Sequence, residues 1–313
     1  GTFTVSQSST APTGFKNSWK VDCTTADASP AADDLLRVSY RIEGQDLQQL
    51  AYGTSGAKAI TLSFYVRSNK TGTYNVQFQQ IDNSFKQAVL SYTIDSADTW
   101  EFKSITVPGD TSGLINDDNG DGFALFWLLG AGSTFTSGSE RSTYTAFANG
   151  DVAPTQTVNL ADNTANEWMI TGVQLEVGEQ ATPFEHRSFS DELARCQRYF
   201  LNYADVRNSY GMTGDLGTGS MYNSTILMCC IRFPIEMRTA PTMTHGSGTS
   251  FYRFWRNSDA DDFNGWTYWY DANRLGGTLQ AEANLSGTSG QAGRVVVNSS
   301  SGDAGYIHLD AEL

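Results

Sequence analysis

The sequence predicts an all-β protein made of two β-sandwich domains, jelly-roll-like in type, that are joined by one short α-helix. Three observations predict it. Short runs of alternating apolar and polar residues follow one another along most of the chain, separated by turns rich in Gly, Ser, Asn and Asp. One segment alone combines helical apolar spacing with a capping signal. At 313 residues, the chain is longer than a typical single domain.

The first domain, residues 1–187, contains a succession of short strand patterns. Apolar residues alternate strictly over residues 60–66 and again over 74–78. The intervening Thr-Gly-Thr supplies a tight connection, so we expect the two runs to pair as a hairpin.

Three later segments of this domain have distinct patterns. In residues 99–107 the apolar positions change from even to odd, which predicts a one-residue bulge near Lys103 and Ser104. Residues 123–129 are almost wholly apolar between Gly-rich turns, a pattern that predicts a buried central strand. Residues 130–166 are rich in Ser, Thr, Gly, Asn and Asp, and we interpret them as a long functional or interface loop.

Residues 167–200 predict a strand that leads into the linking helix, residues 188–200. Residues 167–177 alternate in the manner of a half-buried strand, and an Ala-Thr-Pro turn follows. Ser188 is the expected N-cap, with Asp191 three residues later. Four apolar side chains then share one helical stripe, which we expect to be buried against one or both sandwiches or a partner subunit. They are Phe189, Leu193, Cys196 and Phe200.

Residues 201–313 predict a second and smaller β-sandwich or barrel. Gly, Ser and Thr dominate the segments between its strand-like runs, as in turns. The runs lie at residues 226–233, 249–255, 266–270, 294–297 and 306–309.

The composition argues against several classes of function. A net charge of −14 and a pI near 4.5 argue against binding to nucleic acid or to an anionic membrane, because either needs a basic patch. No apolar run approaches the ~20 residues that span a bilayer, and no signal peptide is expected. The 4 cysteines lack disulfide-framework or zinc spacing, which predicts free thiols in a protein that folds in a reducing cytosol. Because the chain enters a strand directly at Gly1, we expect it to be a fragment of a longer one.

A resemblance to a known family begins in residues 170–200, which read ITGVQLEVGEQATPFEHRSFSDELARCQRYF. This string closely resembles the element that joins two β modules in the tail fibres and related virion appendages of tailed bacteriophages, particularly podovirus-like ones. The resemblance extends to YRIEGQDLQQLAYGTSGAKAITLSFYV at residues 40–66 and to YTIDSADTWEFKSITVPGD at residues 92–110. It continues weakly through FPIEMRTAPTMT at residues 233–244.

The resemblance implies a jelly-roll module similar to carbohydrate-binding modules, usually within a trimeric fibre that touches host surface glycan. We therefore expect a virion fibre protein, a tail fibre first of all, that binds host cell-surface polysaccharide and is assembled in the host cytoplasm. Its expected partners are other virion proteins and further copies of itself in a homotrimer, without nucleic acid or membrane insertion. Two alternatives stay open: a purely structural fibre or connector module, and a polysaccharide depolymerase.

Residues 251–274 hold an unusual concentration of aromatic side chains, and we expect them to form one hairpin-like unit. Trp and Tyr stack on the apolar faces of sugar rings, while Asp and Arg bond to sugar hydroxyls. This makes the second domain the receptor-binding candidate, with a sandwich core or trimer interface as the alternatives. The candidate glycan-binding residues are Tyr252, Trp255, Trp266, Tyr268, Trp269, Arg253, Arg256 and Asp271.

Asp117, Asn119 and Asp121 alternate before a Gly, as in the front half of a calcium loop. The twelfth position of such a loop is Leu128 rather than Glu, which excludes an EF-hand. A looser calcium site completed from elsewhere is one interpretation. An Asx-rich turn between strands, with no cofactor in the protein, is the other.

Acidic residues are also candidates for glycoside hydrolysis, which needs two carboxyl groups about 5–10 Å apart in a cleft. The candidates are Glu43 with Asp46, or the cluster at residues 259–262. Because acidic residues occur throughout the chain, exposed charge is the simpler interpretation. The sequence therefore predicts no catalytic residue and no enzyme.

Overall fold

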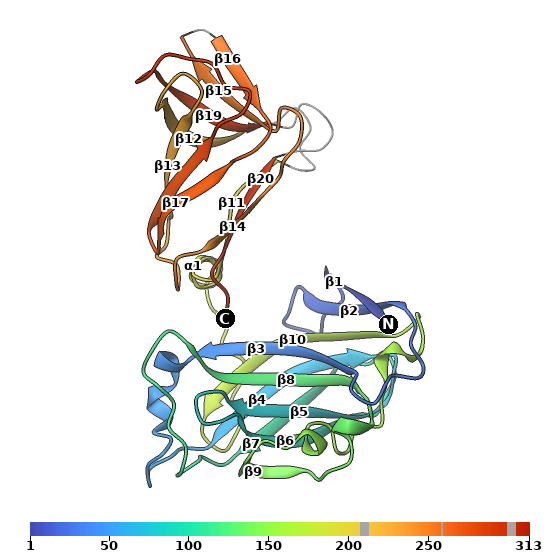
Figure 1. The fold of residues 1–313 in the computed structure, drawn as a ribbon. Coiled ribbons are helices and arrows are strands. Elements are labelled where there is room, and N and C mark those ends of the chain that lie inside the picture. The colour runs from blue at the N-terminus through green and yellow to red at the C-terminus, as the bar shows by residue number, and fades with distance from the viewer. Residues whose placement is uncertain (207–212, 258, 299–304) are drawn as a thin grey trace. The chain divides into compact units, whose positions relative to one another are not determined.

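We analysed a computed structural model, which describes residues 1–206, 213–257, 259–298 and 305–313 (Figure 1). Nearly all of the regular structure is β, and the predicted fold class is confirmed. The chain divides into two compact units, Gly1–His186 together with Leu313, and Arg187–Glu312. In the described part of the chain, no helix is long and apolar enough to cross a membrane.

The first unit is a sandwich of two five-stranded antiparallel sheets. We call the sheet with the order β1-β2-β10-β4-β7 sheet A, and the sheet with the order β3-β8-β5-β6-β9 sheet B. Sheet A consists of β1 (Thr2–Ser8), β2 (Ser18–Thr25), β10 (Glu167–Val177), β4 (Ile60–Ser68) and β7 (Glu101–Val107). Sheet B consists of β3 (Leu35–Glu43), β8 (Asp121–Ala131), β5 (Gly72–Gln80), β6 (Lys86–Ile94) and β9 (Arg141–Thr145). Short 3-10 helices lie at η1 (Gly44–Leu50), η2 (Ser133–Phe135), η3 (Asn149–Asp151) and η4 (Leu160–Asp162).

Strand β8 is buried on both faces, as its apolar sequence predicted. Phe123 and Trp127 face the main core between the two sheets. Phe126 faces the opposite side of sheet B, where Val152 and Ala153 cover it. Residues 130–166, predicted as a functional or interface loop, thus include residues that cover sheet B. Burial of that second face explains why residues 123–129 of β8 include no polar side chain.

The predicted hairpin between residues 60–66 and 74–78 is wrong. Strands β4 and β5 belong to different sheets, and the short connection between them crosses from sheet A to sheet B. Both strands carry strictly alternating apolar residues because both face the same core from opposite sides. A period of two reports which face of a strand is buried and does not identify the neighbouring strand.

The predicted bulge near Lys103 and Ser104 is also wrong. Strand β7 pairs with β4 without any register shift from Val107 to Glu101. The outward side chain of Phe102 lies against Tyr65 instead, with ring centroids 5.1 Å apart.

The second unit is a sandwich of a three-stranded and a seven-stranded antiparallel sheet. The smaller sheet has the order β11 (Phe200–Asp205), β20 (Tyr306–Asp310) and β14 (Thr242–His245). The larger has the order β16 (Asp259–Phe263), β15 (Tyr252–Arg256), β19 (Ala292–Asn298), β12 (Thr213–Met221), β13 (Leu227–Arg232), β18 (Gly276–Ala281) and β17 (Tyr268–Asn273).

The seven-stranded sheet is strongly curled. Its edge strands β16 and β17 are consecutive in the chain and are joined by residues 264–267 alone. Such a connection reaches at most about 18 Å. Six strand spacings in a flat sheet would measure about 29 Å. The sheet must therefore bend toward a partly closed barrel.

Helix α1 (Phe189–Gln197) lies within the predicted linking segment and belongs to the second unit. Its predicted N-cap is confirmed, because the Ser188 hydroxyl accepts the backbone N–H of Asp191 at 3.2 Å. The predicted apolar stripe is not buried in the core of that unit. Phe189 is 81% exposed, and Cys196, also expected to be buried, is exposed. All four cysteines are free, as predicted.

Candidate functional site

The aromatic segment 251–274 does not form the single unit that the sequence predicted. Strands β15 and β16 pair as a hairpin, whereas β17 pairs with β18 at the opposite edge of the seven-stranded sheet. Alternation along the strands then divides the aromatic side chains between the core and the outer face. The candidate glycan-binding residues therefore fall into a buried group and two separate exposed groups.

The buried group includes Tyr252 and Trp266, which pack with Phe263 in the core of the second unit. The ring centroids of Tyr252 and Trp266 are 5.5 Å apart. The Tyr252 hydroxyl lies 2.9 Å from the Gly246 carbonyl oxygen and 2.8 Å from that of Tyr306. Burial is the main cause of the raised pKa of Tyr252. These two candidates are core residues, and their ring faces are not available to a sugar.

Arg256 is also buried, which removes a third candidate. Its guanidinium contacts the carboxylate of Asp261 at 2.5 Å and that of Asp259 at 3.2 Å, and it donates to the carbonyl of Ser286. With its charge compensated inside the unit, Arg256 holds the end of the β15–β16 hairpin.

The first exposed group lies on the outer face of β15. Trp255 is 44% exposed, and the Arg253 guanidinium lies 5.1 Å from the centroid of its ring. Arg253 also forms a forked pair with Asp262, in which Nη2 lies 2.7 Å from Oδ2. The hydrogen bond that Arg253 donates to Asp262 raises the pKa of Arg253. The pair fixes the guanidinium beside an accessible indole ring.

The second exposed group lies on edge strand β17. Tyr268 and Tyr270 are 46% and 42% exposed, and their rings stack with centroids 5.4 Å apart. Trp269 points to the other face, where its Nε1 donates to the Pro241 carbonyl at 3.3 Å. Exposed Asp271 follows at a register shift. Each of the two stacked tyrosines keeps one ring face without a partner from this pair, and the residue that follows them in the chain carries an exposed carboxylate.

The carboxylates that the sequence offered for hydrolysis have other partners. In the cluster at residues 259–262, Asp259 accepts hydrogen bonds from the Ala260 backbone N–H and from Arg256, and these bonds lower its pKa. A general acid for glycoside cleavage needs a raised pKa instead. Glu43 is fully buried, and its Oε2 accepts the Gln45 amide at 2.7 Å. These surroundings do not favour either carboxylate pair as a catalytic dyad.

The predicted calcium residues lie in the turn that leads into β8. Gly120 donates its backbone N–H to Asp118 Oδ1 at 2.8 Å, which is an Asx turn. The Asp121 carboxylate forms an ion pair with Arg41. Among the described residues, no group of three or more His, Cys, Asp or Glu side chains could hold a metal ion. Calcium at Asp117, Asn119 and Asp121 therefore stays a prediction.

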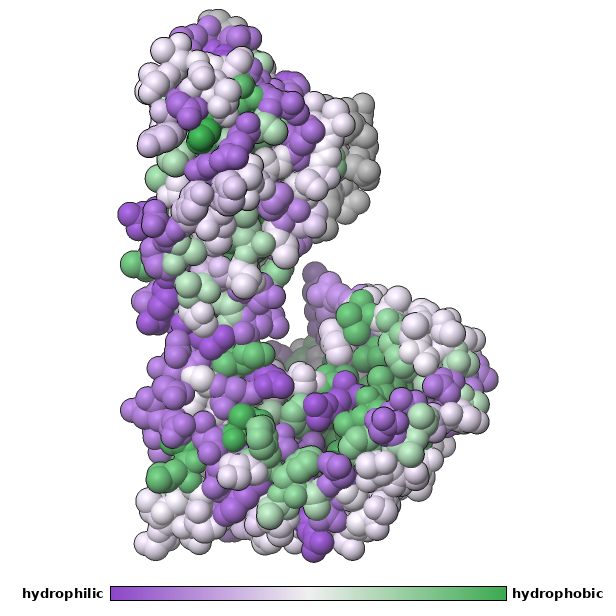
Figure 2. Space-filling view, in the orientation of Figure 1, coloured by the Kyte–Doolittle hydropathy of each residue, from purple (hydrophilic) through white to green (hydrophobic). Residues whose placement is uncertain are grey.

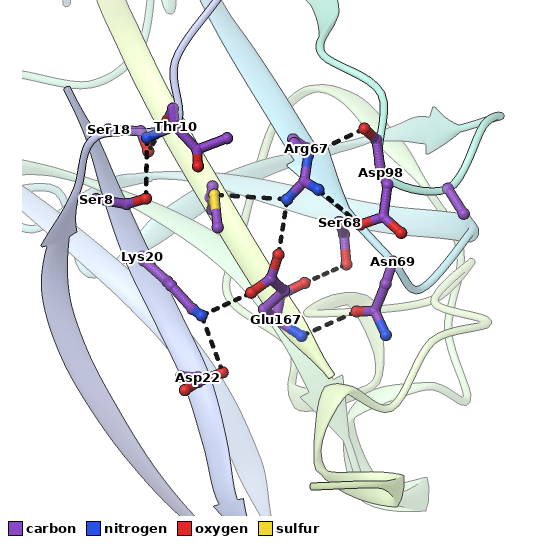
Figure 3. Close-up of polar contacts among 12 residues, drawn as sticks. Ser8, Thr10, Ser18, Lys20, Asp22, Arg67, Ser68, Asn69, Asp98 and Glu167 are labelled. Carbon is purple, nitrogen blue, oxygen red and sulfur yellow. Dashed lines mark hydrogen bonds and ion pairs between the residues drawn. The ribbon is translucent and has the colours of Figure 1, made fainter. Parts of the chain in front are cut away.

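Sequence reasoning missed a charged network on the outer face of sheet A (Figure 3). Glu167 of β10 lies between Lys20 of β2 and Arg67 of β4, and contacts each at 2.6 Å. Arg67 reaches Asp98 at 2.8 Å. Burial alone would raise the pKa of Glu167, but hydrogen bonds from Lys20 and Arg67 outweigh burial and lower it. The network joins three neighbouring strands.

An aromatic row lies on the same face of sheet A, and it too was missed. Phe15 packs against Tyr65 and Phe184, with ring centroids 5.5 and 5.1 Å apart. Gly172 makes room for it, since a Cβ at that position would lie 2.6 Å from Phe15 Cζ. His186 contacts both Phe15 and Phe184, a packing role consistent with its place at the end of the first unit.

No protein-family model matches the chain, and a search of curated proteins finds no match either. Solved structures with some similarity include a family 16 carbohydrate-binding module, with 11% identity, a TM-score of 0.29, and coverage of 56% of this chain and 86% of that one. Another is the enzymatically active domain of tailspike protein 4 of bacteriophage CBA120, with 11% identity, a TM-score of 0.30, and coverage of 56% and 18%. A tandem CBM22 domain from Paenibacillus barcinonensis has 10% identity, a TM-score of 0.29, and coverage of 99% and 92%. Likenesses at these TM-scores do not bear on what the chain binds.

Proposed function

We propose that this chain is a non-enzymatic component of a phage virion fibre, a tail fibre first of all, that attaches the particle to host cell-surface polysaccharide. The resemblance of residues 170–200 and 40–66 to fibre proteins supports the virion setting, and with it a homotrimeric assembly made in the host cytoplasm. The chemistry of the second unit supports the choice of ligand.

The observation that carries the proposal is the exposed pair Tyr268 and Tyr270 on an edge strand. These two large aromatic rings remain at the surface. By contrast, Trp269 on the same strand is partly buried, and several other aromatic side chains of this unit lie in its core. Figure 2 shows that hydrophilic residues predominate over the visible face of the second unit, with hydrophobic ones scattered among them. Isolated aromatic platforms among polar groups suit sugar rings, which carry apolar faces and hydroxyl edges.

Trp255 and Arg253 form the second proposed contact. The indole offers a stacking surface, and a guanidinium can bond bidentately to the carboxylate of an acidic sugar. Two shallow contacts on one unit, repeated over several copies in a particle, give strong attachment from weak individual sites.

Binding of the purified chain to a panel of bacterial polysaccharides tests the proposal. The double variant Tyr268→Ala/Tyr270→Ala should lose about tenfold in affinity, the size of effect expected from a binding hot spot. Tyr222→Ala is the matched control, because Tyr222 is another exposed tyrosine of the same unit. Equal binding by the double variant and the control would contradict the assignment of this site.

Release of reducing ends from the bound polysaccharide distinguishes the two alternative functions. Binding without release supports an adhesin, whereas release identifies a depolymerase. Neither binding nor release across the panel would favour a purely structural fibre module.

A further inference from the structure

Eight strands form the edges of the four sheets in the described part of the chain. An edge strand leaves a row of backbone N–H and C=O groups unpaired, and native proteins protect such rows with charged side chains, prolines, bulges or short strands. The edges of the two sandwiches can therefore be compared with one another by this rule.

Seven of the eight edges carry at least one ionisable side chain on the strand itself. Three of them are also short, since β9 and β16 have 5 residues each and β14 has 4. These side chains, tyrosines aside, are Arg37, Arg41 and Glu43 on β3, Glu101 and Lys103 on β7, Arg141 on β9, Asp205 on β11, His245 on β14, Asp259, Asp261 and Asp262 on β16, and Asp271 on β17.

Strand β1 is the exception. Its 7 residues, TFTVSQS, include no charged residue and no proline. The register with β2 shifts once, between Thr2 and Phe3 at the start of the strand, and then runs without a shift from Phe3 to Ser8. Among the described residues, β2 is the one strand that pairs with β1. Val5 is 62% exposed. In Figure 1, β1 lies at the rim of its sheet. The strand thus combines an open backbone edge with side chains that do not discourage pairing.

We propose that β1 pairs in antiparallel orientation with β1 of a second copy of this chain, which joins two copies of sheet A into one continuous sheet. Six of the other described edges would place charged side chains against an uncharged strand, and the seventh, β14, has only 4 residues. The best complement that this chain offers to β1 is therefore β1 itself. Identical strands in antiparallel pairing are related by a twofold axis, and such a contact closes after two copies. A pairing centred near Val5 would also bring the two exposed valines together.

The pairing of two 7-residue strands is a small contact. Stable protein complexes bury at least about 1,200 Å², more than one such strand pair supplies, so the contact is weak between free chains. Where copies are already held together in a larger assembly, the same contact gains from high effective concentration. It would then join assemblies in pairs, including the homotrimers proposed above.

The substitution Val5→Lys tests this contact. Molar mass in solution, measured by light scattering over a range of concentrations, should be twofold lower for Val5→Lys than for the unmodified chain at the upper end of the range. Ser104→Lys is the matched control, because Ser104 is exposed on β7, the opposite and already charged edge of sheet A. The control should keep the mass of the unmodified chain. Thermal unfolding checks that both variants are folded. If Val5→Lys is unfolded, Thr4→Lys takes its place, because Thr4 lies on the other face of β1.

Three results would overturn the proposal: an unmodified chain that stays monomeric at every concentration, a Val5→Lys mass equal to that of the unmodified chain, or an equal loss of mass in Ser104→Lys. The polysaccharide binding of the Val5→Lys variant, measured alongside, keeps this contact distinct from the glycan site. Unchanged binding together with halved mass supports both inferences separately.

Discussion

The outer face of sheet A and the outer face of the seven-stranded sheet contrast in what their side chains contact. On sheet A, Glu167 is held between Lys20 and Arg67, so the polar groups satisfy one another within the fold. On the seven-stranded sheet, Tyr268 and Tyr270 remain large, apolar and accessible. Groups that satisfy each other contribute to stability, whereas apolar surface left in water is available to a partner. Substitutions on the first face should therefore change the free energy of unfolding, and those on the second should change binding.

The largest expected effect lies directly beneath the charged network. Trp168 follows Glu167 on β10, is fully buried, and donates its Nε1–H to the Tyr92 hydroxyl at 3.2 Å. Trp168→Ala should lower the free energy of unfolding by about 3–5 kcal/mol, because it leaves a large cavity in the core of the first unit. Chemical denaturation measures it. Trp255→Ala is the control, because Trp255 is exposed. An equal loss of unfolding free energy in both variants would contradict the contrast between the two faces.

The next effect depends on pH. Because the folded-state pKa of Glu167 is lowered, its contribution to stability is present above the unfolded value of about 4.3 and is lost as pH falls through the lower folded value. Glu167→Gln should therefore lower the free energy of unfolding at pH 7 by about 1.5–3 kcal/mol, the range for hydrogen bonds to charged groups. The difference in the free energy of unfolding between the variant and the unmodified chain should narrow below about pH 4. Denaturation curves at several pH values measure the gap, and a constant gap down to pH 2 would contradict this assignment.

The smallest effect is expected at Tyr268. Tyr268→Ala should change the free energy of unfolding by less than about 0.5 kcal/mol, as for other surface substitutions. Its neighbour Trp269 is the comparison on the same strand, since it is partly buried against Phe233. Trp269→Ala should lower the free energy of unfolding clearly more than Tyr268→Ala does. The reverse order would show that the exposed ring stabilises the sheet rather than serving a ligand.

Local patterns were sufficient to predict several elements of the fold. The Ser188 cap and the helix after it follow from a few adjacent residues, and β8 follows from an apolar run too continuous for a strand with one wet face. The pairing of β4 was not predictable in this way. Its partners β10 and β7 lie far along the chain, and alternation does not specify them.

The candidate site was predictable in composition but not in orientation. Sequence alternation places Trp255 and Phe254 on opposite faces, yet only the packed core shows that Phe254 points inward. Nor does alternation show that β16 and β17 lie at opposite edges of one sheet. The Glu167 network had no local signal at all, because Arg67 lies 100 residues before Glu167.

The position of β10 has a consequence for how the first unit is made. It lies between β2 and β4 in sheet A, although it is the last strand of that unit to be synthesised. At translation rates of roughly 5 to 20 residues per second, the interval from Thr25 to Glu167 lasts roughly 7 to 30 s. During that time β2 and β4 have no strand between them, and the sheet cannot close. We therefore expect sheet A to be completed in one late step, when β10 inserts between β2 and β4, both of which are synthesised earlier.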